Sequence, residues 1–139
     1  AYEALKVLCD NGVIQTNKEA LKNSVSQAVA PGRLQHITWK QAHIWLDAAH
    51  NRHAIEALLP SLPVLANPFD AILVYTRDDR NLSNELDLLR PFTKQLISDA
   101  TIATPEKALQ YILEKQPAAR ILLLGSFITV AAGLTWLKK

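Results

Sequence analysis

The segment RILLLGSFITVAAGLTWLKK, residues 120–139, decides the fold class of this chain. Its first six residues have strand length, and after Arg120 they form a continuous apolar run, which is typical of a strand buried on both faces of a sheet. Gly125 and Ser126 follow, and the next residues have helical spacing. The expected inward face of this helix consists of Phe127, Val130, Ala131 and Leu134. A buried strand that passes directly into a helix is the basic unit of a parallel α/β sheet.

The same alternation of strand and helix occurs upstream. The run AILVYT (71–76) predicts a buried strand, and LSNELDLLR (82–90) predicts a helix capped by Asn81 or Ser83. The run QLISD (95–99) is a weaker strand. A helix over TPEKALQYILEK follows, in which Thr104 is the expected cap and Pro105 the first helical residue.

The first strands of the chain are expected over LQHIT (34–38) and HIWLD (43–47), arranged as a hairpin. After them, Asn51 can cap a helix whose inward face carries Ile55 and Leu58. The whole pattern predicts a Rossmann-like α/β domain over residues 31–139, with a mainly parallel sheet and helices on both faces. Residues 1–30 predict a short helical segment in front of it, and Pro31 with Gly32 marks the boundary.

Composition excludes several classes of protein. The 139 residues are 49% apolar and 20% charged, which fits one globular domain with a core. The net charge of +2 arises from scattered Lys and Arg residues, so neither a nucleic-acid nor a membrane partner is expected. The sequence contains neither a membrane-spanning apolar run nor a signal-peptide pattern, and we expect a cytoplasmic protein. Phosphate-loop, zinc-protease, paired-cysteine and nucleophile-elbow motifs are all absent, so the fragment alone is expected to be inactive.

Polar residues follow two of the expected strands, at the ends where parallel sheets bind ligands. Asp47 with His50 follows one strand, and Ser126 follows another, at the same expected edge of the sheet. Each group has a second interpretation. Asp47 and His50 could bind ribose hydroxyls or a phosphate, or they could form an ordinary salt-bridged turn. Ser126 and Asn51 are both typical helix caps, and His43 is expected as a surface residue of its strand.

Three separated segments resemble one known family. APGRLQ (30–35), LDAAHNRHA (46–54) and LLLGSF (122–127) resemble the W-P-G-R-L-E, L-D-G-A-H-N-P-H-A and G-S-L-Y segments of the folylpolyglutamate synthase and dihydrofolate synthase family. These enzymes belong to the Mur ligase superfamily, whose C-terminal domain is a Rossmann-like sheet. The resemblance implies that residues 31–139 are this domain. Residues 1–30 are then the helical tail of a central ATPase domain that the fragment lacks.

The resemblance also implies a reaction. The family adds L-glutamate to a folate or dihydropteroate carboxylate, using ATP and Mg²⁺ through an acyl-phosphate intermediate. By this resemblance, Arg33 and His50 are catalytic, and Arg33, Asp47 and His50 bind the nucleotide. Ser126 is then placed to hold the incoming glutamate. The family's metal ligands lie in the ATPase portion, so the resemblance implies no metal ligand here and implies the ATPase domain of the parent chain as a partner.

The segments depart from the family pattern without losing a residue of implied function. Ala48 and Arg52 replace a glycine and a proline, while Ala30 and Ile128 replace aromatic residues. Two other interpretations stay open. The chain could be the same domain of a peptidoglycan Mur ligase, or a non-catalytic α/β interaction module in which Asp47 to His53 form a capped turn.

Overall fold

The computed structural model describes residues 32–76 and 82–139 of the chain. The chain divides into two units, residues 1–30 and 31–139, and every element named below belongs to the second. The helical segment expected over residues 1–30 lies outside the described residues, and so does the expected cap Asn81. Among the described helices, none is long and apolar enough to cross a bilayer.

The second unit contains one five-stranded sheet between helices. The strands are β1 (Gln35–Trp39), β2 (Ala42–Asp47), β3 (Ala71–Tyr75), β4 (Leu96–Ser98) and β5 (Arg120–Gly125). The helices are α3 (Arg52–Leu58), α4 (Leu62–Leu65), α5 (Ser83–Leu89), α6 (Pro105–Lys115) and α7 (Phe127–Leu137), with 3-10 turns η1 (Leu59–Ser61) and η2 (Arg90–Phe92). The strand order is β1-β2-β5-β3-β4, in which only β1 is antiparallel to its neighbour. The predicted mainly parallel sheet with a leading hairpin is confirmed.

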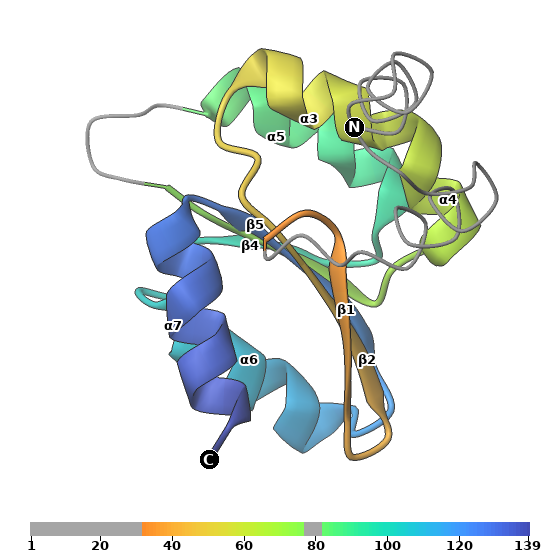
Figure 1. Cartoon of the computed structure of the whole chain (residues 1–139). Helices are drawn as coiled ribbons and strands as arrows, with labels where there is room; N and C mark the ends of the chain where they lie inside the picture. The colour runs from red at the N-terminus through yellow and green to blue at the C-terminus, as the bar shows by residue number, and fades with distance from the viewer. Residues whose placement is uncertain (1–31, 77–81) are drawn as a thin grey trace, which may run out of the picture. The chain divides into compact units, whose positions relative to one another are not determined.

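Helices cover both faces of the sheet, as the continuous apolar strands require. Figure 1 shows α3, α4 and α5 on one side of the sheet and α6 and α7 on the other. Alternate residues of β5 point to opposite faces of the sheet. Ile121 and Leu123 pack with α6 and α7. Leu122 and Leu124 pack with α3 and α5. All four side chains are fully buried, and each burial stabilises the fold by about 2 kcal/mol.

Three of the expected helix caps are confirmed. The Asn51 side chain accepts a hydrogen bond from the Ala54 amide at 2.8 Å, and Thr104 accepts one from the Lys107 amide at 3.3 Å. Ser126 caps α7 in the same way. The alternative that Ser83 caps α5 is wrong, because Ser83 is already the first helical residue and Leu82 occupies the cap position.

The inward face of α7 differs from the expected one. Phe127 is 59% exposed and Ala131 is exposed, whereas Thr129 and Gly133 are buried. Two contacts that apolar spacing does not encode set this rotation of the helix. The Thr129 hydroxyl donates to the Tyr75 carbonyl, and α7 packs so close to the sheet that a Cβ on Gly133 would lie 2.7 Å from Leu123 Cδ2. Val130 and Leu134 do contact the core, as predicted.

Gly125 allows β5 to end directly beside β3. The two strands pair in parallel with Tyr75 opposite Gly125. A Cβ on Gly125 would lie 1.7 Å from the Tyr75 carbonyl oxygen, and the residue has a φ of +155°. A side chain therefore cannot be accommodated at this position without moving the backbone of β3.

We expect Gly125→Ala to lower the free energy of unfolding by about 3 kcal/mol or more, because a backbone carbonyl cannot move aside as a side chain can. Urea unfolding of the chain measures this. Gly133→Ala is the matched control: its new methyl group meets only the ends of side chains, Leu123 Cδ2 at 2.7 Å and Leu46 Cδ2 at 3.5 Å, and alanine favours the helix by about 1 kcal/mol. Equal stability of the two variants would contradict this account of Gly125.

Candidate functional site

The topology indicates the carboxyl end of β5 as the candidate ligand-binding position. The helix that follows β5, α7, packs on one face of the sheet, whereas α3 after β2 and α5 after β3 pack on the other. The connections that leave β5 and its two neighbours therefore diverge to opposite faces. Such a divergence opens a crevice at the strand ends, which is where open α/β sheets bind their ligands.

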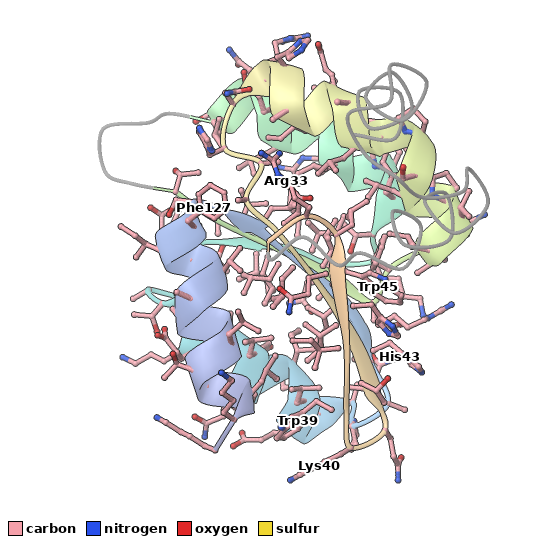
Figure 2. All side chains as sticks on the ribbon, viewed as in Figure 1. Arg33, Trp39, Lys40, His43, Trp45 and Phe127 are labelled. Atoms are coloured by element: carbon pink, nitrogen blue, oxygen red, sulfur yellow. The ribbon has the colours of Figure 1, made fainter. Side chains whose placement is uncertain are left out.

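The strand register brings the expected residues to this edge. Asp47 is the last residue of β2 and lies opposite Leu124 of β5. Gly125 and Ser126 are the two residues that follow Leu124. The expectation that Asp47 and Ser126 share one edge is therefore confirmed. In Figure 2, Arg33 and Phe127 lie toward this end of the sheet, whereas Trp39 and Lys40 lie at the opposite end.

Asp47 is a buried carboxylate whose two oxygens are both held by backbone amides. Its side chain is 3% exposed; Oδ1 accepts from the Ala49 amide and Oδ2 from the Leu34 amide, each at 2.8 Å. Hydrogen bonds to an ionised group contribute about 1.5–3 kcal/mol each, which is more than neutral ones contribute. Asp47 therefore holds the loop before β1 onto the end of β2. Direct contact between Asp47 and a nucleotide stays a prediction.

The loop that Asp47 holds contains Arg33. The Ala48 amide donates to the Gly32 carbonyl at 2.8 Å, and both Gly32 and Leu34 have left-handed backbones, with φ of +70° and +41°. The chain therefore curls tightly on either side of Arg33, whose side chain is exposed. Within the described part of the chain, no hydrogen bond or ion pair holds the Arg33 guanidinium. An exposed cation on a fixed loop at this edge is suited to an anionic ligand.

His50 is fixed by the same turn. Its Nδ1 lies 2.8 Å from the Ala48 carbonyl oxygen, and His50 is partly buried. Because a carbonyl only accepts, Nδ1 carries the proton, and Nε2 of the neutral ring is an acceptor. The methyl group of Ala48, which stands where the resembled family has glycine, is buried in the core on the α6 and α7 side. The departure at Ala48 thus adds packing to this turn.

Ser126 is part of a hydroxyl network that the sequence analysis missed. Its hydroxyl accepts from the Thr129 amide at 3.3 Å, and its own amide donates to Thr129 Oγ1 at 3.3 Å. The Thr129 hydroxyl in turn donates to the Tyr75 carbonyl at 2.7 Å. A threonine three residues after the cap serine was the available signal, since the third helical residue can complete a capping box.

Tyr75 anchors this network from β3. Burial, with smaller contributions from Asp99 and Glu106, raises the pKa of Tyr75 to about 12. The Tyr75 hydroxyl therefore keeps its proton over the physiological pH range and donates it to the Ile102 carbonyl at 2.7 Å. The Tyr75 hydroxyl thus connects β3 to the segment before α6. The Tyr75 carbonyl connects β3 to α7.

His43 belongs to a different part of the sheet. It is exposed, as expected, and its Nδ1 lies 3.0 Å from Nε2 of His36, whose ring stacks on Trp45. Burial and then the neighbouring His43 lower the pKa of His36. His43 lies opposite Arg120, the first residue of β5, so the pair is at the other end of the strand from the candidate site.

The edge can hold an anion. Arg33 supplies a cation, and the N-terminus of α7 next to Ser126 supplies a positive dipole end. Among residues 32–76 and 82–139, no group of three or more His, Cys, Asp or Glu side chains could hold a metal ion. The donor set thus suits phosphate or carboxylate oxygens.

Neither a protein-family model nor a curated protein sequence matches the chain. Solved structures do match. They include the apo form of the folylpolyglutamate synthetase of Lactobacillus casei, with a TM-score of 0.72 and 20% identity over 96% of this chain and 34% of that one. A bifunctional folylpolyglutamate synthase/dihydrofolate synthase with Mn, AMPPNP and L-glutamate bound matches with a TM-score of 0.70 and 22% identity, over 91% and 36%.

A further match is the bifunctional enzyme of Yersinia pestis complexed with AMPPNP and Mn, with a TM-score of 0.69 and 19% identity over 91% of this chain and 36% of that one. The chain spans about a third of the length of these structures. Their likeness to it confirms the predicted fold class, a mainly parallel α/β sheet with helices on both faces.

We expect Asp47→Ala to lower the free energy of unfolding by about 2–4 kcal/mol, because a buried amide and a partly buried one lose a charged acceptor. Amide hydrogen exchange should also accelerate at Leu34 and Ala49. Asn51→Ala is the control, since it removes an exposed cap worth about 1 kcal/mol and leaves the Leu34 amide bonded. Unchanged exchange at Leu34 in Asp47→Ala would contradict the role of Asp47 in holding this loop.

Proposed function

We propose that the chain is the C-terminal domain of a ligase of the folylpolyglutamate synthase and dihydrofolate synthase family, which adds L-glutamate to a folate or dihydropteroate carboxylate with ATP. One observation carries the proposal. The Asp47 carboxylate joins the loop at residues 32–34 to the D-A-A-H-N turn, beside β5, which ends at Gly125 just before Ser126. The segments of the resemblance, far apart in the sequence, thus meet at the edge where such a fold binds ligands.

Each residue has a proposed role. Arg33 contacts the ATP phosphates and stabilises the charge that develops during phosphoryl transfer. Asp47 serves nucleotide binding by holding the Arg33 loop in place, and His50 presents Nε2 to the cleft. Ser126 binds the incoming glutamate through its hydroxyl group. Asp47, His50 and Ser126 come from the ends of strands and the starts of helices, and Arg33 comes from the loop that Asp47 holds, so the sheet positions the backbone of each group.

ATP and a divalent cation are part of the proposal. The relatives solved with AMPPNP and Mn, one of them also with L-glutamate, support this combination of ligands. The exposed Arg33 and the N-terminus of α7 fit phosphate or carboxylate oxygens, whereas the described residues offer no metal-binding cluster. We therefore place the Mg²⁺ ligands in the ATPase domain of the parent chain. Mg²⁺ would neutralise charge on the transferring phosphoryl group there. We propose the cytoplasm as the site of this reaction.

The parent protein tests the proposal directly. We expect it to release ADP only when L-glutamate and a folate or dihydropteroate are both present, and the 139-residue chain alone to release none, because it lacks a phosphate loop. Coupled measurement of ADP formation with each substrate omitted in turn checks both statements. ADP formation with a peptidoglycan precursor instead would assign the domain to a peptidoglycan ligase. Absence of any ligase activity would favour an interaction module.

We expect Arg33→Ala in the parent protein to lower kcat by an amount equivalent to about 2–4 kcal/mol, with a smaller effect on KM for glutamate. The reason is that a positioned cation stabilises transition-state charge more than bound substrate. Arg52→Ala is the matched control, since Arg52 is an exposed arginine paired with Glu56 at 2.8 Å. Turnover of Arg33→Ala at the level of Arg52→Ala would exclude this role of Arg33.

A further inference from the structure

A cavity lies at the end of the sheet opposite to the candidate site. It has a volume of about 410 Å³ and is lined by the tip of the β1–β2 hairpin, by α6 with the loop after it, and by α7. Small-molecule sites have volumes of about 300–1,000 Å³, so this cavity is large enough for a ligand. In Figure 2, Trp39 and Lys40 mark this end, away from Arg33 and Phe127.

Two indole rings and a leucine form the apolar part of the cavity. The ring centroids of Trp39 and Trp136 are 5.3 Å apart, and the ring planes are tilted by 38°. Both rings are partly buried against the core, and Leu113, which also lines the cavity, is 6% exposed. Indole faces favour offset stacking with other aromatic rings. The cavity is therefore suited to a planar aromatic ligand.

A cation without a carboxylate partner lines the same cavity. Lys40 Nζ lies 4.4 Å from the centroid of the Trp39 ring, which is a cation–π contact. Among the residues that the structure describes, no carboxylate forms an ion pair with Lys40. The contact with Trp39 holds the ammonium group at the cavity, where an anionic group of a ligand can pair with it.

The hairpin turn does not by itself explain a lysine at position 40. Lys40 has a φ of +53°, in the left-handed region that glycine and asparagine adopt most readily. Lys40 and Gln41 are the two residues that join β1 to β2, and glycine, asparagine and aspartate are the usual residues of such turns. Contacts of the lysine side chain must offset this backbone conformation. The structure shows one such contact, with Trp39.

A carboxylate lines the cavity from α6. Glu114 is exposed, and its Oε1 accepts a hydrogen bond from Gln110 Nε2 at 2.8 Å. Within residues 32–76 and 82–139, no ion pair joins Glu114 to Lys40 or to another cation. The cavity thus presents two opposite charges that do not pair with each other. A ligand that complements both carries an anion and, at another position, a hydrogen-bond donor.

We infer that this cavity is a binding site for a planar aromatic carboxylate that also carries a hydroxyl or amino group. The ligand carboxylate pairs with Lys40, the hydroxyl or amino group donates to Glu114, and the aromatic ring packs against Trp136. The inference does not depend on the proposed function, because the cavity lies at the other end of the sheet from Asp47. If the indoles only closed the end of the core, no such ligand would bind.

Four probes that differ in single chemical features test the inference. The compound 6-hydroxy-2-naphthoate carries all three features; 2-naphthoate lacks the donor, 2-naphthol lacks the anion, and 4-hydroxycyclohexanecarboxylate lacks the aromatic ring. The readout is an NMR titration of the indole N–H signals of the 139-residue chain, assigned with single Trp→Phe variants. Trp39, Trp45 and Trp136 are its three tryptophans. Trp45 packs on the other face of the sheet and is the internal control.

We expect 6-hydroxy-2-naphthoate to shift the Trp39 and Trp136 signals to saturation and to leave the Trp45 signal unchanged. The probes 2-naphthoate and 2-naphthol should each bind about tenfold more weakly, the effect of one lost hydrogen bond to a charged group. The cyclohexane compound should shift none of the three signals, because it cannot stack on an indole ring.

Lys40→Gly separates binding from folding. Glycine adopts a φ of +53° without strain, so this variant should be at least as stable to urea as the wild type. It should nevertheless bind both naphthoates about tenfold more weakly and 2-naphthol with unchanged affinity, whereas Lys40→Arg should keep the affinity for all three. Lys107→Gln, which removes an exposed lysine of α6 outside this cavity, is the matched control and should change none of these affinities.

Glu114→Ala tests the second polar contact. It should bind 6-hydroxy-2-naphthoate no more tightly than 2-naphthoate, because the hydroxyl group then has no carboxylate to donate to. Unchanged Trp39 and Trp136 signals, or equal shifts at Trp45, would overturn the inference. Equal affinities of 2-naphthoate and 2-naphthol would exclude the pairing with Lys40. An effect of Lys107→Gln as large as that of Lys40→Gly would show that only net charge matters.

Discussion

The candidate site depends on one buried carboxylate. Asp47 accepts hydrogen bonds from two backbone amides. One is the Ala49 amide of its own turn, and the other is the Leu34 amide, 13 residues earlier in the chain. A carboxylate buried to 3% exposure is stable only when its charge is met by such donors. The same two bonds therefore compensate for the burial of the charge and fix the position of Arg33. Loss of this carboxylate would weaken the attachment of the Arg33 loop, which the bond from the Ala48 amide to the Gly32 carbonyl would still hold.

The central strand explains why this edge is available at all. β5 lies between β2 and β3, buried on both faces, and the helix after it packs opposite to those after its neighbours. Its last residue must be glycine because the Tyr75 carbonyl occupies the space of a side chain. The strand end, the start of α7 and the end of β3 are thereby held in one rigid arrangement. Rigid placement is what a site for charged ligands requires, because a misplaced donor contributes little.

Local chemistry made much of the structure predictable. Apolar runs without alternation predicted the parallel strands. The cap residues Asn51, Thr104 and Ser126 predicted the starts of three helices, because a cap acts within a few residues of the chain. The rotation of α7 was not predictable from spacing. Phe127 and Ala131 are as apolar as the residues that are buried, and the choice among them depends on Thr129 and Gly133 meeting β3 and β5.

The sequence by itself determined the fold class, the positions of the strand ends and the segments in which a site could lie. Only the tertiary structure decided what each side chain there does. It showed that Asp47 holds a loop, that the Thr129 hydroxyl joins α7 to the Tyr75 carbonyl, and that Arg33 is carried on a tightly curled chain. The physical reason is that propensities and caps are short-range, whereas these hydrogen bonds join residues up to 54 positions apart. Such bonds exist only after the sheet has brought its strands together.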